Sequence, residues 1–127
     1  MRAVDTNVLV RLLTRDDAKQ VAAAEEFVEA GGAWVSLVVL VEAIWVLSTV
    51  YDVGSKPMAD AIEMLLDHQS LVVQNSDVVA IAVANYRRRP SVGLSDHLVL
   101  EIARQAGNTP LGTFDRGLAK MDGAQRL

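Results

Sequence analysis

Four acidic residues from distant parts of the chain lie where a carboxylate could do chemistry: Asp5, Glu42, Asp96 and Asp115. Four carboxylates can share one small site only if cations neutralise them, because like charges a few ångströms apart repel strongly in a partly dry cleft. Hard divalent ions with oxygen ligands, Mg²⁺ or Mn²⁺, are the natural counterions. Such a site polarises a phosphoryl group and activates water for in-line displacement. The four acids together therefore predict phosphodiester hydrolysis rather than acyl or glycosyl chemistry.

Each acid also has a purely structural interpretation. Asp5 could form a turn or cap a helix, and Asp96 and Asp115 occupy first-turn positions where a carboxylate favours the helix dipole. Glu42 differs because ten of the eleven residues from 37 to 47 are apolar, so we expect this helix to be buried nearly all round. An unpaired carboxylate is costly in such surroundings, and Glu42 must then pair with an arginine or bind metal.

The elements that position these acids alternate between short strands and longer helices. Hydrophobic periodicity and capping residues predict strands near 3–4, 33–35, 71–73 and 111–114, with helices near 8–13, 17–28, 37–53, 55–66, 76–89 and 95–106 and a last short one after Asp115. This alternation predicts an α/β fold with a parallel sheet. Ligand sites of such sheets lie at the carboxyl ends of the strands, where Asp5 and Asp115 fall.

Length and composition limit the class of protein. A chain of 127 residues predicts a single domain spanning 1–127. The lack of cysteine excludes a disulfide scaffold, a thiolate zinc site and a cysteine nucleophile. No signal peptide or bilayer-spanning run is visible, so we expect a cytoplasmic protein with no membrane partner.

The formal net charge of −4 is unusual for a nucleic-acid binder. The four site acids account for it, since without them twelve acidic residues face twelve basic ones. An acidic balance of this origin does not exclude an RNA substrate.

Four sequence segments resemble the PIN domain, specifically the VapC-like toxins of type II toxin–antitoxin systems. They are Val4-Asp5-Thr6-Asn7-Val8-Leu9, Leu40-Val41-Glu42-Ala43-Ile44-Trp45-Val46-Leu47, Leu94-Ser95-Asp96-His97-Leu98-Val99 and Leu111-Gly112-Thr113-Phe114-Asp115-Arg116-Gly117-Leu118. Their order and spacing cover essentially the whole chain. The segment after Asp96 is bulkier than the small-residue helix common at this place in the family.

The resemblance implies a PIN-domain fold, in which helices flank a central parallel β-sheet, and a metal-dependent endoribonuclease. It assigns the family's acidic quartet to Asp5, Glu42, Asp96 and Asp115, and supporting polar roles to Asn7, Thr113, Thr6 and Ser95. It also implies a homodimer and a cognate antitoxin that blocks the site. The expected reaction is hydrolysis of RNA with Mg²⁺ or Mn²⁺, leaving 5′-phosphate and 3′-hydroxyl ends.

RNA affinity must come from local positive charge because the overall charge opposes it. The candidates are Arg11 and Arg15 after the first strand, the run 87–89, and Arg116 with Lys120 beside Asp115. Alternative functions are a PIN-like module that binds RNA or protein without catalysis, and a receiver-type signalling domain. The receiver domain lacks support because no lysine stands at the end of the last predicted strand.

Overall fold

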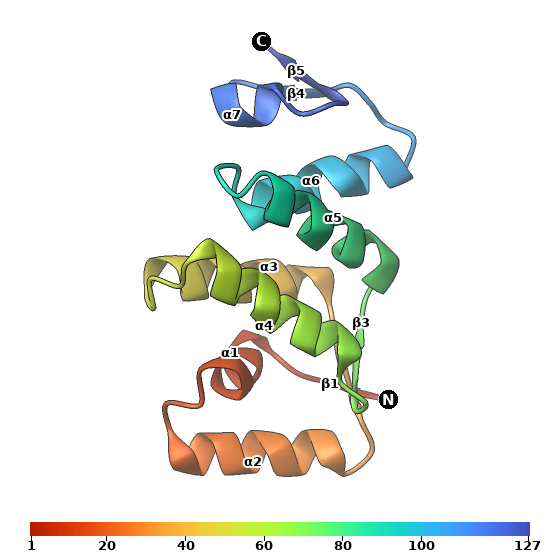
Figure 1. Cartoon of the computed structure of the whole chain (residues 1–127). Helices are drawn as coiled ribbons and strands as arrows, with labels where there is room; N and C mark the ends of the chain where they lie inside the picture. The colour runs from red at the N-terminus through yellow and green to blue at the C-terminus, as the bar shows by residue number, and fades with distance from the viewer. The chain divides into compact units, whose positions relative to one another are not determined.

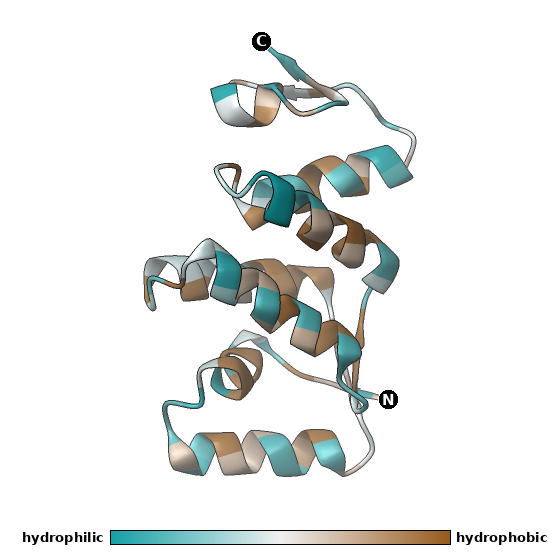
Figure 2. Cartoon of the chain, viewed as in Figure 1, coloured by the Kyte–Doolittle hydropathy of each residue, from teal (hydrophilic) through white to brown (hydrophobic).

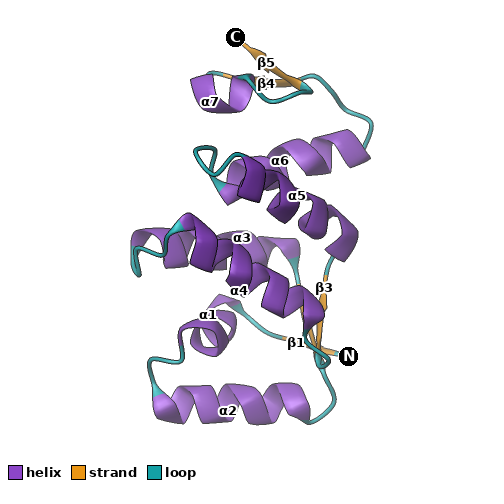
Figure 3. Cartoon of the chain, in the orientation of Figure 1, coloured by secondary structure: helices purple, strands orange, loops and turns teal.

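A computed structural model describes all 127 residues, and the chain divides into two compact units. Unit 1 comprises Met1–Ser76 and unit 2 comprises Asp77–Leu127. Figure 1 labels the elements in chain order, and Figure 3 shows that helices make up most of both units.

Unit 1 contains a parallel three-stranded sheet and four helices. The strands β1 (Arg2–Ala3), β2 (Ala33–Val35) and β3 (Leu71–Val73) pair in that order. The helices are α1 (Thr6–Thr14), α2 (Ala18–Glu29), α3 (Leu37–Thr49) and α4 (Ser55–Asp67). In the sheet, Trp34 lies opposite Ala3 on one side and Val72 on the other.

The core of unit 1 forms where α1, α3 and α4 bury their apolar faces. Leu9, Leu40, Leu47 and Ile62 are almost wholly inaccessible to solvent. Figure 2 shows α3 as mostly hydrophobic, whereas hydrophilic and hydrophobic residues alternate along α2. This difference follows from the sequence, because α3 contains a single charged residue and α2 contains four.

Unit 2 contains a second parallel pair of strands and three helices. They are α5 (Ser76–Arg88, whose first residue closes unit 1), α6 (Leu94–Gln105), β4 (Leu111–Thr113), α7 (Arg116–Ala119) and β5 (Ala124–Arg126). The strand β4 pairs with β5. A cluster of Val92, Leu100 and Leu118 packs with the residues of this β4–α7–β5 segment and fixes it to α6.

The predicted α/β architecture of parallel strands flanked by helices is confirmed. Strand β5 was not predicted, because it is short, polar and largely exposed. The helix expected to reach residue 53 ends at Thr49, and Asp52 just beyond it has a left-handed backbone with φ of 52°. None of the helices combines the length and apolar character needed to cross a bilayer.

Candidate active site

Asp5 lies directly after β1 and is the N-cap of α1. Its Oδ1 accepts a hydrogen bond from the backbone N–H of Val8 at 3.0 Å. This bond satisfies one of the N–H groups that the first turn of a helix leaves unpaired. The carboxylate is exposed, and its Oδ2 has no hydrogen-bond partner. Asp5 therefore caps a helix and still presents one free oxygen.

Glu42 lies on α3 and is joined to the start of α1 by a side-chain hydrogen bond. The hydroxyl of Thr6 donates to Oε2 of Glu42 at 2.9 Å, across 36 positions of sequence. Because Thr6 follows Asp5 in the chain, this bond places the Glu42 carboxylate close to the Asp5 segment. Unit 1 thus brings together three of the residues predicted for the site.

The prediction that the helix carrying Glu42 is buried nearly all round is wrong. Helix α3 packs by one face, which carries Leu40, Ala43, Ile44 and Leu47. Glu42 lies on the opposite face with Val38 and Trp45, which are 69% and 63% exposed. A mostly apolar composition therefore did not require burial all round, and desolvation does not force Glu42 to find a cation.

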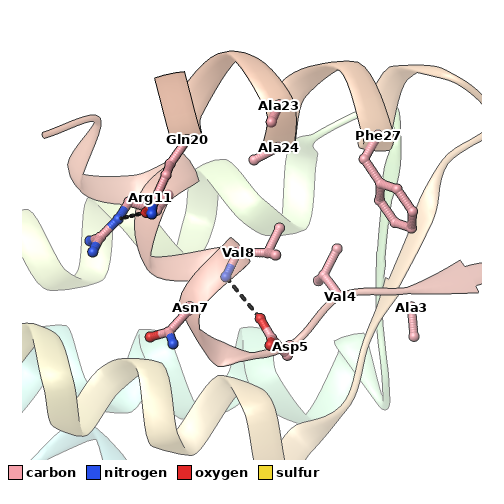
Figure 4. Close-up of a pocket in the computed structure, with 10 residues that line it drawn as sticks. All are labelled: Ala3, Val4, Asp5, Asn7, Val8, Arg11, Gln20, Ala23, Ala24 and Phe27. Atoms are coloured by element: carbon pink, nitrogen blue, oxygen red, sulfur yellow. Dashed lines mark hydrogen bonds between the residues drawn. The ribbon is translucent and has the colours of Figure 1, made fainter. Parts of the chain in front are cut away.

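A cavity of about 630 Å³ opens beside Asp5, between the end of β1, α1 and α2. Figure 4 shows its lining, with Asp5 and Asn7 at the start of α1 and the ring of Phe27 on α2. The polar groups at its edge are those of Asp5, Asn7, Arg11 and Gln20, and the remaining lining is apolar. The side chain of Asn7 is exposed and is able to hold a water or a ligand beside Asp5.

In unit 2, Asp96 lies in the first turn of α6, half-buried. Partial burial and, to a smaller extent, the negative charge of Asp115 raise the pKa of Asp96 above its ordinary value, while His97 acts in the opposite direction. The effect of Asp115 on this pKa means that the two carboxylates interact electrostatically. Ser95 precedes Asp96 in the same turn and is also half-buried.

Asp115 follows β4 and caps α7 in the way that Asp5 caps α1. Its Oδ1 accepts from the backbone N–H of Leu118 at 2.7 Å. The backbone N–H of Asp115 in turn donates to the hydroxyl of Thr113 at 3.0 Å. Thr113 therefore holds the turn that carries Asp115, and Oδ2 of the carboxylate has no hydrogen-bond partner.

Four of the basic residues predicted to contact RNA, Arg11, Arg15, Arg116 and Lys120, differ in their surroundings. Arg11 pairs with Asp16 at 3.3 Å and donates to the hydroxyl of Tyr51 at 3.0 Å. Arg15 forms an ion pair with Glu25. By contrast, Arg116 and Lys120 are exposed and have no carboxylate partner. Of these four residues, the two beside Asp115 are thus the ones whose charge is not already paired within the protein.

Glu101 on α6 is a buried carboxylate that was not among the predicted site residues. It is 4% exposed, and it accepts from Arg104 at 3.1 Å and from the side-chain amide of Gln105 at 3.0 Å. The spacings of three and four residues along one helix are the signal that could have indicated this cluster. Since its partners are all on α6, Glu101 has a structural role.

The four predicted carboxylate residues divide into two pairs, one in each unit. Asp5 and Glu42 belong to unit 1, and Asp96 and Asp115 belong to unit 2. No group of three or more histidine, aspartate or glutamate side chains that could hold a metal gathers in the structure. The donor chemistry nevertheless fits Mg²⁺ or Mn²⁺, which prefer carboxylate oxygens, and a cation would relieve the repulsion between Asp96 and Asp115.

The comparisons with known proteins identify the family of the chain. The PIN domain family model matches residues 2–124, which include parts of both units. No curated protein and no solved structure gives a significant match. Because the matched segment covers nearly the entire sequence, this chain belongs to the PIN domain family, whose members are generally metal-dependent nucleases.

Proposed function

We propose that this protein is an endoribonuclease that depends on Mg²⁺ or Mn²⁺ and hydrolyses RNA phosphodiester bonds to leave 5′-phosphate and 3′-hydroxyl ends. The observation that carries the proposal is the pair of interacting carboxylates, Asp96 and Asp115, in a chain of the PIN domain family. The negative charge of Asp115 disfavours ionisation of Asp96, and a bound cation would relieve this repulsion.

The proposed ligands are Asp5, Glu42, Asp96 and Asp115, all of which offer oxygen atoms. When bound, a divalent cation polarises the scissile phosphate and lowers the pKa of coordinated water. The role of the capping carboxylates follows from their geometry, since Oδ1 is held by the helix and Oδ2 remains available.

Four polar residues would orient these ligands. The Thr6 hydroxyl fixes Glu42 through the 2.9 Å bond, and the Thr113 hydroxyl holds the backbone N–H of Asp115 at 3.0 Å. Asn7 and Ser95 lie beside Asp5 and Asp96 and would position water or substrate. Such supporting residues typically contribute 10–100-fold to metal affinity or activity.

Substrate contacts are proposed for Arg116 and Lys120, with Arg11 and Arg15 as further candidates. The first two are favoured because their charges are not paired within the protein. Arg11 and Arg15 would have to exchange an internal ion pair for a phosphate contact.

The biological setting that we propose is a VapC-like toxin acting in the cytoplasm as a homodimer and neutralised by a cognate antitoxin. We also propose that the two units act together as one PIN domain over residues 1–127. The support for both is the order of the four sequence segments and the match over residues 2–124.

The proposal is tested by RNA cleavage with Asp5→Asn and Asp96→Asn proteins. Asparagine caps helices as well as aspartate does, so Asp5→Asn should leave α1 intact. We expect the rate of RNA cleavage to fall by at least about 100-fold. A loss of this size reaches or exceeds the upper end of the contribution of a residue that only orients a metal ligand. The assay follows labelled RNA with Mn²⁺ or Mg²⁺ and identifies the ends by sequencing.

Asp17→Asn is the matched control, because Asp17 caps α2 through the backbone N–H of Gln20 in the same geometry. It should cleave RNA as the wild-type protein does. Cleavage that persists in both site variants, or in EDTA, would refute the proposal. RNA binding without metal-dependent cleavage by the wild-type protein would instead favour a non-catalytic binding module.

A further inference from the structure

The chain as a whole has a negative formal charge, but its C-terminal unit is basic. Of the twelve basic residues, seven lie in unit 2, which has only five of the sixteen acidic ones. Unit 2 therefore has a formal charge of +2, whereas unit 1 has a formal charge of −6. Because association with nucleic acid depends on local potential, unit 2 is the part of the chain suited to a polyanion.

Four of these cations line one pocket within unit 2, with a volume of about 280 Å³. They come from three places in the chain: Arg88 and Arg89 at the end of α5, Arg104 on α6, and Lys120 just after α7. The remaining lining residues are Asn85, Met121 and Asp122. The pocket has no aromatic side chain on which a base could stack, so its chemistry favours a phosphate over a nucleobase.

The internal partners of the cations show which charges remain for a ligand. Arg104 is committed, because it pairs with Glu101 at 3.1 Å and donates to the carbonyl oxygen of Asp122. Arg88 donates only to the neutral side chain of Asn85. Arg89 and Lys120 have no carboxylate partner at all. Three positive charges are therefore not neutralised by a bonded acid, and Asp122 is the single acid in the lining.

The end of α5 is held firmly enough to present these arginines. The buried ring of His97 uses Nε2–H to donate to the backbone carbonyl of Arg89 at 3.0 Å. The same ring meets Tyr86 edge-on at 5.9 Å between centroids. This arrangement fixes the backbone at Arg89 while its side chain stays exposed.

We propose that this pocket binds a backbone phosphate of the RNA substrate, outside the position of cleavage. The choice of RNA rests on the function proposed above. Lys120 follows Asp115 by five residues across α7, a helix rise of about 7.5 Å. The pocket residue Lys120 and the proposed site carboxylate of Asp115 therefore flank the same short helix.

The test compares RNA binding by the wild-type protein and by an Arg88→Gln/Arg89→Gln variant of the full chain. Neither arginine has a carboxylate partner to leave unpaired, and glutamine keeps most of each side chain. Binding of a fluorescent 20-nucleotide single-stranded uridine RNA is followed by anisotropy in EDTA, between 50 and 200 mM salt. Circular dichroism checks that both proteins are folded.

Each lost phosphate contact should reduce the slope of log affinity against log salt by about 0.7. The variant should therefore show a slope smaller by about 0.7 to 1.4. The salt concentration changes fourfold between 50 and 200 mM. The ratio of wild-type affinity to variant affinity should therefore be about 3- to 7-fold larger at 50 mM than at 200 mM.

Lys19→Gln/Lys56→Gln is the matched control, because it removes the same charge from unit 1. Its slope should equal that of the wild-type protein. Equal slopes for the wild-type and pocket proteins, equal losses in both variants, or no RNA binding by the wild-type protein would each overturn the inference. Since binding is measured without divalent metal, its failure is distinct from failure of the nuclease, which is read from cleavage by Asp5→Asn and Asp96→Asn.

Discussion

The hydrogen bond between Thr6 and Glu42 gives the most direct test of how the site is supported. In a Thr6→Val protein the side chain keeps its β-branched shape but loses the hydroxyl that lies 2.9 Å from Oε2 of Glu42. No other group donates a hydrogen bond to Glu42. The substitution therefore releases this carboxylate without changing the ligand itself, and Asp5 continues to cap α1.

The expected magnitude follows from the exposure of the pair. A hydrogen bond to a charged group contributes about 1.5–3 kcal/mol when well shielded. Because Glu42 is exposed and Thr6 half-buried, we expect about 1 kcal/mol, near the low end of the effect of residues that orient metal ligands. The metal concentration for half-maximal cleavage should then rise about 5- to 10-fold, while cleavage at saturating metal should recover.

The assay measures initial rates of RNA cleavage against Mn²⁺ concentration for the wild-type, Thr6→Val and Thr6→Ser proteins. Thr6→Ser retains the donor and should resemble the wild type. Equal half-saturating Mn²⁺ concentrations for Thr6→Val and the wild-type protein would contradict this role of Thr6. An equal loss of metal affinity in Thr6→Ser and Thr6→Val would also contradict it, because the hydroxyl would then not be the cause.

Three further predictions concern charge. Replacing Arg104 by Met leaves the Glu101 side chain, which is 5% exposed, without its cation. The free energy of unfolding measured in urea should fall by about 2–3 kcal/mol. This loss is smaller than for a fully buried pair because the Arg104 side chain is 27% exposed. Replacing Asp115 by Asn removes a negative charge that raises the pKa of Asp96, so that pKa should fall, as measured by carboxyl NMR titration. Hydrogen bonds lower the pKa of Asp16 below its ordinary value, so its contribution to stability is present above the ordinary pKa and is lost as pH falls through the lowered one. An Asp16→Asn protein should accordingly show a weaker loss of thermal stability on acidification below about pH 4, and an unchanged slope would contradict the assignment.

Local features of the candidate site could be predicted from the sequence. The expectation that Asp115 opens a helix after a strand is confirmed by its bond to Leu118, and Asp5 likewise caps α1. These features depend on a few neighbouring residues, because an N-cap bond closes within three positions. The exposure of Glu42 could not be predicted in the same way, since it depends on which face of α3 packs against the rest of unit 1.

The sequence by itself determined the α/β class, the placement of acids at strand ends and helix starts, and membership of the PIN domain family. Only the tertiary structure decided which distant residues meet: Thr6 with Glu42, Asp96 with Asp115, and the end of α5 with Lys120. Periodicity and capping are properties of short segments, so a single sequence displays them. Contacts between distant segments depend on the combined packing of many side chains, which no short sequence pattern predicts.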